Sequence, residues 1–260
     1  MSSGELSVIE IFGPTIQGEG ELAGKWSHFI RLGGCGYRCT WCDTMQAVDP
    51  ELVKQNSTKM SVKTIMAQIM MLPDAPWVTI SGGDPMVWKN HLQQLSKDLK
   101  RQNFKVAIET QGQILPGESL DYFDLITVSP KPPSSGMDGK FDSNVIRAYL
   151  ATQLGNRGSG MPWPKVVFKI AAFTDEDLDW IEDLHALFPK VPLYITPGTH
   201  QLSPEMYKTY GETQLDHYKA AGVLDNMRRI YERILMRPNL KYATAIPQLH
   251  VLAWGDKKGV

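Results

Sequence analysis

CGYRCTWCDT, residues 35–44, contains all three cysteines of this 260-residue chain. Cys35, Cys39 and Cys42 follow a C-x3-C-x2-C spacing, whereas iron–sulfur clusters normally take four cysteine thiolates. Three thiolates without a fourth cysteine can hold a four-iron cluster, but they leave one iron open to an outside ligand. Because open coordination positions mark catalytic rather than structural metal sites, the motif predicts a 4Fe-4S cluster that binds a small molecule at its fourth iron.

Three other roles for these cysteines stay open at this level. A Cys3His zinc site is possible because the chain has six histidines, but none lies within the motif and the paired C-x2-C or H-x3-H pattern of zinc sites is missing. A disulfide with one spare thiol would satisfy the count, although an odd number of cysteines argues against a disulfide framework. Three inert thiols that fall together by chance are the third alternative.

Apolar segments with strand character alternate with amphipathic segments along the chain. Strand, helix and strand in succession imply parallel pairing with right-handed crossovers. We therefore expect an α/β fold, an open or closed (β/α) barrel with a mainly parallel sheet and its catalytic groups at the carboxyl ends of the strands. The expected strands are Phe29–Leu32, Trp77–Ile80, Lys105–Ile108, Leu125–Val128, Val166–Ile170, Pro192–Ile195 and Tyr242–Leu249.

Three helices are expected between these strands. Ser61 is suited to cap a helix whose apolar residues, from Val62 to Met70, share one face. A second helix is expected from about Val87 to Arg101. A third follows Thr174, with acidic residues in its first turn, where the helix dipole favours them.

One stretch interrupts the alternation. Residues 132–164 contain PPSSGMDGKFDSN, a short helix-like piece and GNRGSGMPWP. Loops of this length are usually functional or mobile. A chain of this length suits a single α/β domain, so we expect one domain over residues 1–260, with an irregular surface excursion or lid at about 132–164.

The charge balance argues against two classes of partner. Lys and Arg number 27 against 28 Asp and Glu, and there is no basic run or tail, so neither nucleic acid nor an anionic membrane is expected as a partner. No apolar stretch approaches the roughly 20 residues of a membrane span, and the first residues lack the plan of a signal peptide. With few cysteines and an oxygen-sensitive site, the chain is expected in a reducing cytoplasm.

The second motif is SGGDP, residues 81–85, directly after the apolar segment WVTI. Adjacent glycines at the end of a strand let the backbone approach a ligand closely and take positive φ angles. Taken alone, the motif is equally consistent with an ordinary tight turn.

Together, the three-cysteine motif and a GGE-like turn about forty residues later resemble the radical S-adenosylmethionine (SAM) enzymes. In that superfamily the amino and carboxylate groups of SAM chelate the open iron, and the glycine turn binds the SAM amino group. The turn here is Gly82, Gly83 and Asp84, where the third position is usually Glu, so the acidic side chain is kept but shortened. The resemblance implies a partial (β/α) barrel of the radical SAM type.

Further segments narrow the resemblance to the 7-carboxy-7-deazaguanine synthase family. They are IFGPTIQGEG at 11–20, HFIRLGGC at 28–35, CDT at 42–44, ETQG at 109–112 and SPKPP at 129–133. The match covers the N-terminal two-thirds of the chain in pieces, plus a weaker tail.

This resemblance assigns substrate contacts to Ile16, Gln17, Gly18, Glu19, Arg31, Ser81 and Val260. Gln17 and Glu19 offer an amide and a carboxylate that suit the donor–acceptor edge of a pterin or guanine-like ring, although a polar, glycine-rich turn is the structural alternative. Arg31 offers a fork for a substrate carboxylate, or else a structural ion pair. In the family the C-terminal carboxylate, here that of Val260, reaches the site, whereas a frayed tail is the default for a chain end.

The cofactor contacts implied by the resemblance, besides the cysteines, are Trp41, Asp43, Gly83, Ser129, Pro130, Lys131 and Thr196. Trp41 would shield the cluster or pack on the adenine, or else belong to the core, and Lys131 is equally consistent with a solvated surface lysine. In the family the hydroxyl equivalent to Thr44 binds Mg2+, a hard ion that prefers oxygen ligands and water. Otherwise Asp43 and Thr44 would form a helix cap or an Asx turn.

The resemblance also implies the reaction. The reduced cluster would cleave SAM to methionine and a 5′-deoxyadenosyl radical, which removes a hydrogen from C6 of 6-carboxy-5,6,7,8-tetrahydropterin. Ring contraction and loss of ammonia then give 7-carboxy-7-deazaguanine, as in deazapurine biosynthesis of the queuosine type. The implied electron donor is flavodoxin- or ferredoxin-like, and the implied assembly is a homodimer. A glycyl-radical activating enzyme, which shares the cysteine spacing, and a non-catalytic metal-binding module are the alternatives.

Overall fold

A curved, mainly parallel sheet organises the computed structural model of the chain, which describes residues 4–152, 165–199, 212–255, 257 and 259. Within these residues the strand order is β3-β1-β2-β4-β5-β6-β7-β8-β9. Every neighbouring pair from β2 to β9 is parallel, whereas β1 pairs antiparallel with both β2 and β3. The strands are β1 Leu6–Ile16, β2 Trp26–Leu32, β3 Thr58–Met60, β4 Trp77–Gly82, β5 Lys105–Thr110, β6 Leu125–Val128, β7 Lys165–Ala172, β8 Leu193–Pro197 and β9 Thr244–Ala245.

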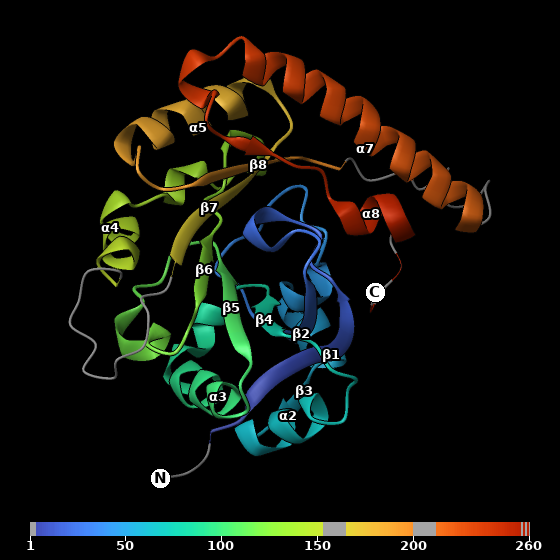
Figure 1. Ribbon diagram of the computed structural model, residues 1–260, viewed down its shortest axis with the longest axis vertical. Helices are drawn as coiled ribbons and strands as arrows, with labels where there is room; N and C mark the ends of the chain where they lie inside the picture. Colours follow the sequence, from blue (N-terminus) through green and yellow to red (C-terminus); the bar gives the residue numbers. More distant parts are fainter. Residues whose placement is uncertain (1–3, 153–164, 200–211, 256, 258, 260) are drawn as a thin grey trace.

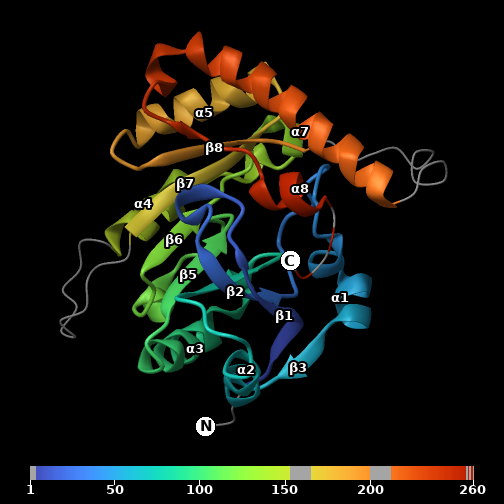
Figure 2. The same cartoon turned by 45° about the vertical axis from the view of Figure 1, so that its right-hand side comes forward.

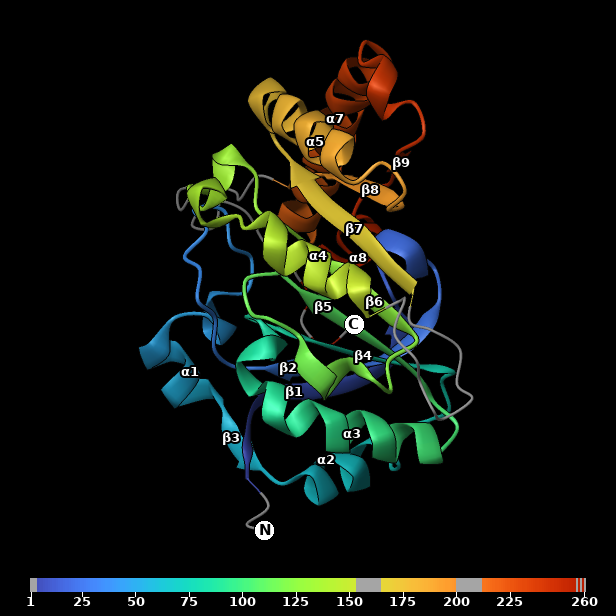
Figure 3. The same cartoon turned by 90° about the vertical axis from the view of Figure 1, so that its left-hand side faces the viewer.

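Helices cover the outer face of the sheet, and the sheet does not close on itself. Figure 1 shows α2 and α3 beside the first strands and α5 and α7 beside the last ones, while Figure 3 shows α3, α4 and α5 along the outer face. In Figure 2, α8 lies on the opposite, concave side. The helices are α1 Pro50–Asn56, α2 Val62–Ile69, α3 Lys89–Arg101, α4 Ser143–Ala151, α5 Asp175–Leu187, α7 Glu212–Leu235 and α8 Leu249–Trp254. None that the structure describes is long and apolar enough to cross a membrane.

The expected α/β class and partial barrel are confirmed, and six of the seven expected strands match β2 and β4–β8 to within a few residues. The seventh, at 242–249, is largely wrong. Only Thr244–Ala245 is a strand, because Pro247 cannot donate to a ladder and α8 begins at Leu249. Two strands were not expected. The strand β1 was missed because Gly13 and Pro14 interrupt its strand-like sequence pattern, and β3 was missed because it has three residues.

The expected helix starts are confirmed at two positions. The Ser61 hydroxyl accepts a hydrogen bond from the Thr64 amide at 3.1 Å and caps α2. Thr174 and Asp177 form a reciprocal capping box at the start of α5. The helix expected from about Val87 begins at Lys89, after a 3₁₀ turn over Pro85–Trp88.

The described part of the 132–164 excursion is the connection between β6 and β7. It contains α4, whose Ile146 and Tyr149 are fully buried in the main core. Within the expected excursion, α4 therefore packs against the sheet as part of the core, because the helix is amphipathic, whereas several residues before it are exposed. The remainder, 153–164, lies outside the described residues.

Alternate residues of a strand point to opposite faces of the sheet, and in β7 they divide between the main core and the concave side. Val166, Phe168 and Ile170 belong to the main hydrophobic core under the helices. Val167 faces the concave side and packs in a smaller cluster with Leu22, Ala107 and Leu125. This small cluster forms an apolar floor, and the next inward-facing positions, Lys169 on β7 and Glu109 on β5, are charged.

Candidate active site

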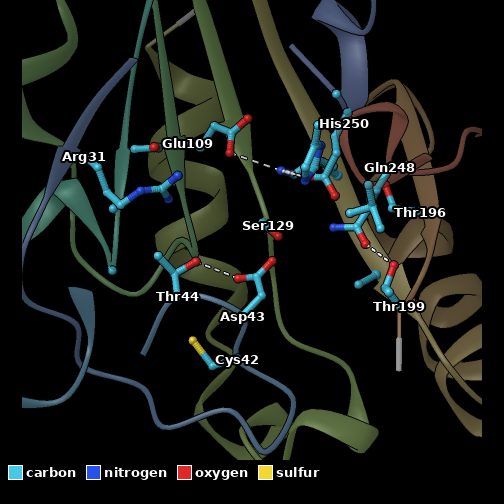
Figure 4. A pocket seen from close by; sticks show the side chains of 18 of the residues that line it. Arg31, Cys42, Asp43, Thr44, Glu109, Ser129, Thr196, Thr199, Gln248 and His250 are labelled. Carbon is cyan, nitrogen blue, oxygen red and sulfur yellow. Dashed lines mark hydrogen bonds and ion pairs between the residues drawn. The ribbon is translucent and has the colours of Figure 1, made fainter. Parts of the chain in front are cut away.

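The carboxyl ends of the parallel strands surround a cavity of about 590 Å³. Its lining comes from strands β1, β2, β4, β5, β7 and β8 and from the loops that follow them and β6, and His250 and Val251 of α8 complete one side. Figure 4 shows residues from opposite walls facing one space: Arg31, Glu109 and Ser129 on one side, Thr196, Thr199, Gln248 and His250 on the other, and Cys42, Asp43 and Thr44 beneath. This is the position at which α/β barrels carry catalytic groups.

Glycines bring the cysteine loop and the SGGDP turn into direct contact. The Gly83 amide donates to the Leu32 carbonyl at 3.0 Å, and the Asp84 amide donates to the Gly34 carbonyl at 2.7 Å. A Cβ atom at Gly83 would lie 2.4 Å from the carbonyl oxygens of Gly34 and Ala47 and 2.9 Å from the Cβ of Cys35. Only glycine fits at this position, so the turn after β4 sits immediately against the first cysteine.

The three cysteines line the cavity, and each is partly buried. Burial raises the pKa of all three thiols, that of Cys42 to about 11. Binding of a metal centre requires these thiols to lose their protons. Where the structure describes the chain, it places no three His, Cys, Asp or Glu side chains close enough to hold one metal ion. A four-iron cluster takes each thiolate at a different iron, so three thiols on one wall fit a cluster better than the zinc alternative.

Asp84 occupies the position where the resemblance places Glu. Its side chain is fully buried, and Oδ1 accepts hydrogen bonds from the Thr110 hydroxyl at 2.8 Å and the Met86 amide at 3.1 Å. Burial raises its pKa to about 6. The shortened side chain therefore caps the 3₁₀ turn after β4 and ties it to the end of β5.

Trp41 and Lys131 form one side of the cavity beside the cysteines. The Trp41 indole donates to the Ser134 hydroxyl at 3.0 Å, and its ring lies 5.0 Å from that of Phe173. The Lys131 ammonium donates to the Ser129 hydroxyl at 2.8 Å and lies 5.9 Å from the centre of the Trp41 ring. Lys131 is partly buried and lines the cavity, so it is not a solvated surface residue, and burial lowers its pKa.

Asp43 and Thr44 follow the last cysteine and face the cavity (Figure 4). The Thr44 hydroxyl donates to Asp43 Oδ1 at 2.6 Å. Thr44 precedes a 3₁₀ turn at Met45–Ala47, but its side chain makes no cap hydrogen bond there. The hydroxyl and the carboxylate therefore offer neighbouring oxygen atoms to a hard cation.

A polar layer lies above the apolar floor. Lys169 Nζ lies 2.6 Å from Glu19 Oε2 and 3.1 Å from Glu109 Oε2, and the Gln17 amide donates to Glu109 Oε1 at 2.9 Å. Burial alone would raise the pKa of Glu19, but the Lys169 ammonium and His250 hold it at about 2. Burial alone would lower the pKa of Lys169, but Glu109 and Glu19 raise it above its ordinary value. The layer is thus an ionised lysine between two carboxylates.

Arg31 is held by an ion pair in this structure. Its Nε lies 2.6 Å from Glu10 Oε1, and both side chains line the cavity. The contact uses one of the five N–H donors of the guanidinium. The ion pair expected as the structural alternative is therefore present, and it places the guanidinium in the wall of the cavity.

The C-terminal segment closes the side of the cavity next to Gly18. The Leu249 amide donates to the Gly18 carbonyl at 3.0 Å, and the Thr199 hydroxyl donates to the Gln248 side chain. His250 lines the cavity on the same side. Val260, expected to reach the site with its carboxylate, lies outside the described residues.

The structure brings almost all of the expected site residues together. The lining includes Ile16, Gln17, Gly18, Glu19, Arg31, Cys35, Cys39, Trp41, Cys42, Asp43, Thr44, Ser81, Gly83, Ser129, Lys131 and Thr196. Pro130 is the exception among the described ones, since it is buried and does not line the cavity.

Several lining residues were not anticipated, among them Lys169, Glu109, Gln248 and His250. Lys169 could have been recognised from the sequence, because it is a lysine inside the otherwise apolar strand segment VVFKIAA. A buried charge needs a partner. His250 could not have been recognised in this way, because no nearby sequence feature indicates that its segment folds back against Gly18.

The open, curved sheet and the three-cysteine loop at its strand ends define the class: a partial (β/α) barrel of the radical SAM type. A family model described as a 4Fe-4S single cluster domain matches residues 16–128, which include both the cysteine motif and SGGDP. The crystal structure of QueE from Escherichia coli has the same fold, with a TM-score of 0.63 and 21% identity over 95% of each chain.

Similarity over the full length then gives the family. The 7-carboxy-7-deazaguanine synthase of Bacillus subtilis (strain 168) is 34% identical over 260 residues, which cover 98% of this chain and 98% of that protein. The 7-carboxy-7-deazaguanine synthase of Bacillus cereus is 34% identical over 98% of this chain and 99% of its own. The chain belongs to the 7-carboxy-7-deazaguanine synthase family, and the resemblance in its sequence is confirmed.

Proposed function

We propose that this enzyme converts 6-carboxy-5,6,7,8-tetrahydropterin to 7-carboxy-7-deazaguanine with loss of ammonia. The supporting observation is that the cysteine loop and the polar layer of Gln17, Glu19, Glu109 and Lys169 face the same cavity. One wall is suited to a cluster with an open iron, and the other supplies acceptors and donors for a heterocyclic edge. Membership of the family supports the reaction.

The cysteines Cys35, Cys39 and Cys42 would hold the 4Fe-4S cluster. When bound, the reduced cluster and SAM supply the carbon-centred radical that removes a hydrogen from the substrate. The protein orients the two molecules and keeps water away from them. Gly83 lies directly against the cysteine loop, and its backbone would be available to a ligand of a cluster held there.

SAM would lie between the cysteine loop and the ends of β4, β6 and β8. The residues we assign to it are Trp41, Asp43, Gly83, Ser129, Pro130, Lys131 and Thr196. Trp41 offers an aromatic face, and Lys131 with Ser129 offers donors at the end of β6. Pro130 acts only by shaping this strand end, because its side chain does not line the cavity.

The pterin would lie against the polar layer, with Ile16, Gly18 and Ser81 completing its surroundings. Gln17 and Glu19 read the ring edge, and Arg31 binds the 6-carboxylate through the nitrogens that Glu10 does not occupy. We also assign the C-terminal carboxylate of Val260 to this site.

Mg2+ would bind at Thr44. The hydroxyl of Thr44 and the carboxylate of Asp43 present oxygen atoms to the cavity, and Mg2+ usually takes few protein ligands and completes its shell with water and substrate oxygens. Bound there, the ion would polarise the substrate and fix its orientation.

A flavodoxin- or ferredoxin-like protein in a reducing cytoplasm would supply the electron, and we propose a homodimer as the assembly. Light scattering of the purified protein tests the dimer. Reduction of the cluster by a purified flavodoxin, followed by absorbance, tests the donor.

Product analysis tests the reaction. The protein is reconstituted anaerobically with iron and sulfide, reduced, and given SAM, Mg2+ and 6-carboxytetrahydropterin, and the products are identified by mass spectrometry. Formation of 7-carboxy-7-deazaguanine supports the proposal. Formation of 5′-deoxyadenosine without it would point to another substrate, as for a glycyl-radical activating enzyme. A loaded cluster that leaves SAM intact would indicate a non-catalytic module.

A further inference from the structure

Lys169 is an unusual residue for its position in the sheet. It lies in the middle of β7, a strand paired on both sides, where Val167 and Ala171 are the neighbouring inward-facing residues. Its side chain is only 11% exposed. A buried ammonium is strongly unfavourable unless it is paired and hydrogen-bonded, so the strand carries this charge in spite of its cost to stability.

The partners of Lys169 come from two distant parts of the chain. Glu19, in the loop after β1, lies 2.6 Å from Nζ, and Glu109, near the end of β5, lies 3.1 Å from it. The two carboxylates are themselves 17% and 23% exposed. Two such groups without a cation between them would share a proton, because like charges in a partly buried site cannot both ionise easily.

The two carboxylates beside Lys169 match the hydrogen-bond donors of a pterin ring. A pterin presents N–H donors at its 2-amino group and at N3, and an ionised carboxylate only accepts hydrogen bonds. A protonated carboxyl would instead place an O–H donor against a donor. A protonated carboxyl keeps one acceptor oxygen but loses the other, so an ionised carboxylate pair offers the donor edge of the ring its full set of acceptors.

We propose that Lys169 is a positioning residue, whose ammonium lies between Glu19 and Glu109 and holds their carboxylates together as a pair of acceptors for the donor edge of the pterin. The Gln17 amide holds Glu109 from the other side at 2.9 Å, and a carboxylate has room for further donors on each oxygen. This inference rests on the proposed function and adds Lys169 as a determinant of substrate specificity.

The charged groups around the pair come from every wall of the polar layer. They are Lys169 on β7, Lys131 after β6, and His250 on α8, and the last two are unchanged in every variant described below. The Lys169 charge also contributes to the lowered pKa of Lys131, so a variant that keeps the charge at position 169 is needed to hold the surroundings of Lys131 constant.

Binding of 6-carboxypterin, an analogue without the C6 hydrogen, tests the proposal without turnover. Its affinity is measured by titration calorimetry on the reconstituted full-length protein between about pH 5 and about pH 7, the range in which shared carboxylate protons titrate. Lys169→Gln keeps a hydrogen-bond donor and removes the charge. We expect it to weaken binding roughly 10- to 100-fold at the lower pH, and to recover part of this loss as the pH rises.

Two controls define what the lysine does. Lys169→Arg keeps the charge and is expected to retain most of the affinity and the pH profile of the unchanged enzyme. Lys165→Gln is the matched control, because Lys165 lies on the same strand, pairs with Glu21 and is 50% exposed outside the cavity. It is expected to bind as the unchanged enzyme does. If Lys169→Gln does not fold, as judged by circular dichroism and cluster absorbance, Lys169→Met takes its place with the same expectation.

Several outcomes would overturn the proposal. Unchanged affinity in the neutral variant would show that the pair does not need Lys169. A loss of equal size at every pH would show that the lysine only supports packing. If the unchanged enzyme forms 7-carboxy-7-deazaguanine and either outcome is observed, the proposed function stands and this inference fails. If the unchanged, cluster-loaded enzyme binds no pterin, both fail.

Discussion

The carboxylate of Asp177 accepts a hydrogen bond from the backbone amide of Ser134 at 2.9 Å, which ties the start of α5 to the loop after β6. Its second oxygen accepts from the amides of Phe173 at 2.8 Å and Thr174 at 3.2 Å. Ser134 in turn accepts from the indole of Trp41 at 3.0 Å. One fully buried carboxylate thus joins the end of β7 to the residues beside the cysteine loop.

Replacing Asp177 is expected to destabilise the fold strongly. Asp177→Ala leaves three backbone amides without their acceptor, and a charge-assisted, buried network of this kind contributes about 3 kcal/mol or more to the free energy of unfolding. Urea denaturation of the cluster-free protein measures it. Asp183→Ala, at an exposed position on the same helix, is the control and should change stability by less than about 0.5 kcal/mol. Equal stabilities of the two variants would contradict the assigned role.

Asp84 gives a prediction about pH. Its pKa is raised by burial from 3.8 to about 6, so the folded state holds a proton in a range where the unfolded chain releases it. The contribution of this group to stability therefore falls as the pH rises from about 4 to above 6, by about 3 kcal/mol. Asp84→Asn cannot titrate.

Urea denaturation of both cluster-free proteins at several pH values tests this. Since all other groups titrate in both, the stability of Asp84→Asn relative to the unchanged protein should improve by that amount between pH values of about 4 and about 7. A constant difference would show that the pKa of Asp84 is the same in the folded and the unfolded state.

Arg31 is expected to distinguish pterins by their carboxylate. The unchanged enzyme should bind 6-carboxypterin roughly 10- to 100-fold more tightly than pterin without the carboxylate. Arg31→Met should lose that preference while still binding the ring. Glu10→Gln, which removes only the partner of the ion pair, should keep it. Arg31→Met that retains the preference would assign Arg31 to a structural ion pair alone.

The Mg2+ site can be tested at Thr44. Thr44→Val removes the hydroxyl that donates to Asp43, so product formation should become slow and insensitive to Mg2+ added after chelation. Thr58→Val, at an exposed position on β3, should respond to Mg2+ like the unchanged enzyme. A response of normal size in Thr44→Val would place the ion elsewhere or remove it from the mechanism.

Much of the fold and of the site could be predicted from local sequence patterns. The apolar runs predicted six central strands because buried parallel strands are apolar on both faces. Ser61 and Thr174 predicted the starts of their helices because their side chains are suited to cap a helix N-terminus. The cysteine spacing and the SGGDP turn marked two loops, and the structure brings them into contact at Gly83.

What the sequence did not reveal depends on contacts between distant segments. Lys169 and Glu19 are 150 positions apart, and only the curvature of the open sheet brings them together. The position of His250 depends on the fold-back that joins Leu249 to Gly18. The strand expected at 242–249 failed because local β propensity there gives way to Pro247 and a short helix.

The central claim is that the three cysteines hold a cluster whose radical chemistry acts on the pterin in the shared cavity. The measurement that tests it most directly uses 6-carboxytetrahydropterin deuterated at C6, with the reconstituted, reduced enzyme, SAM and Mg2+. We predict that deuterium appears in 5′-deoxyadenosine together with 7-carboxy-7-deazaguanine, and that Cys35→Ala, Cys39→Ala and Cys42→Ala each abolish both. Formation of the product without deuterium in 5′-deoxyadenosine, or a fully loaded cluster that leaves SAM intact, would contradict the claim.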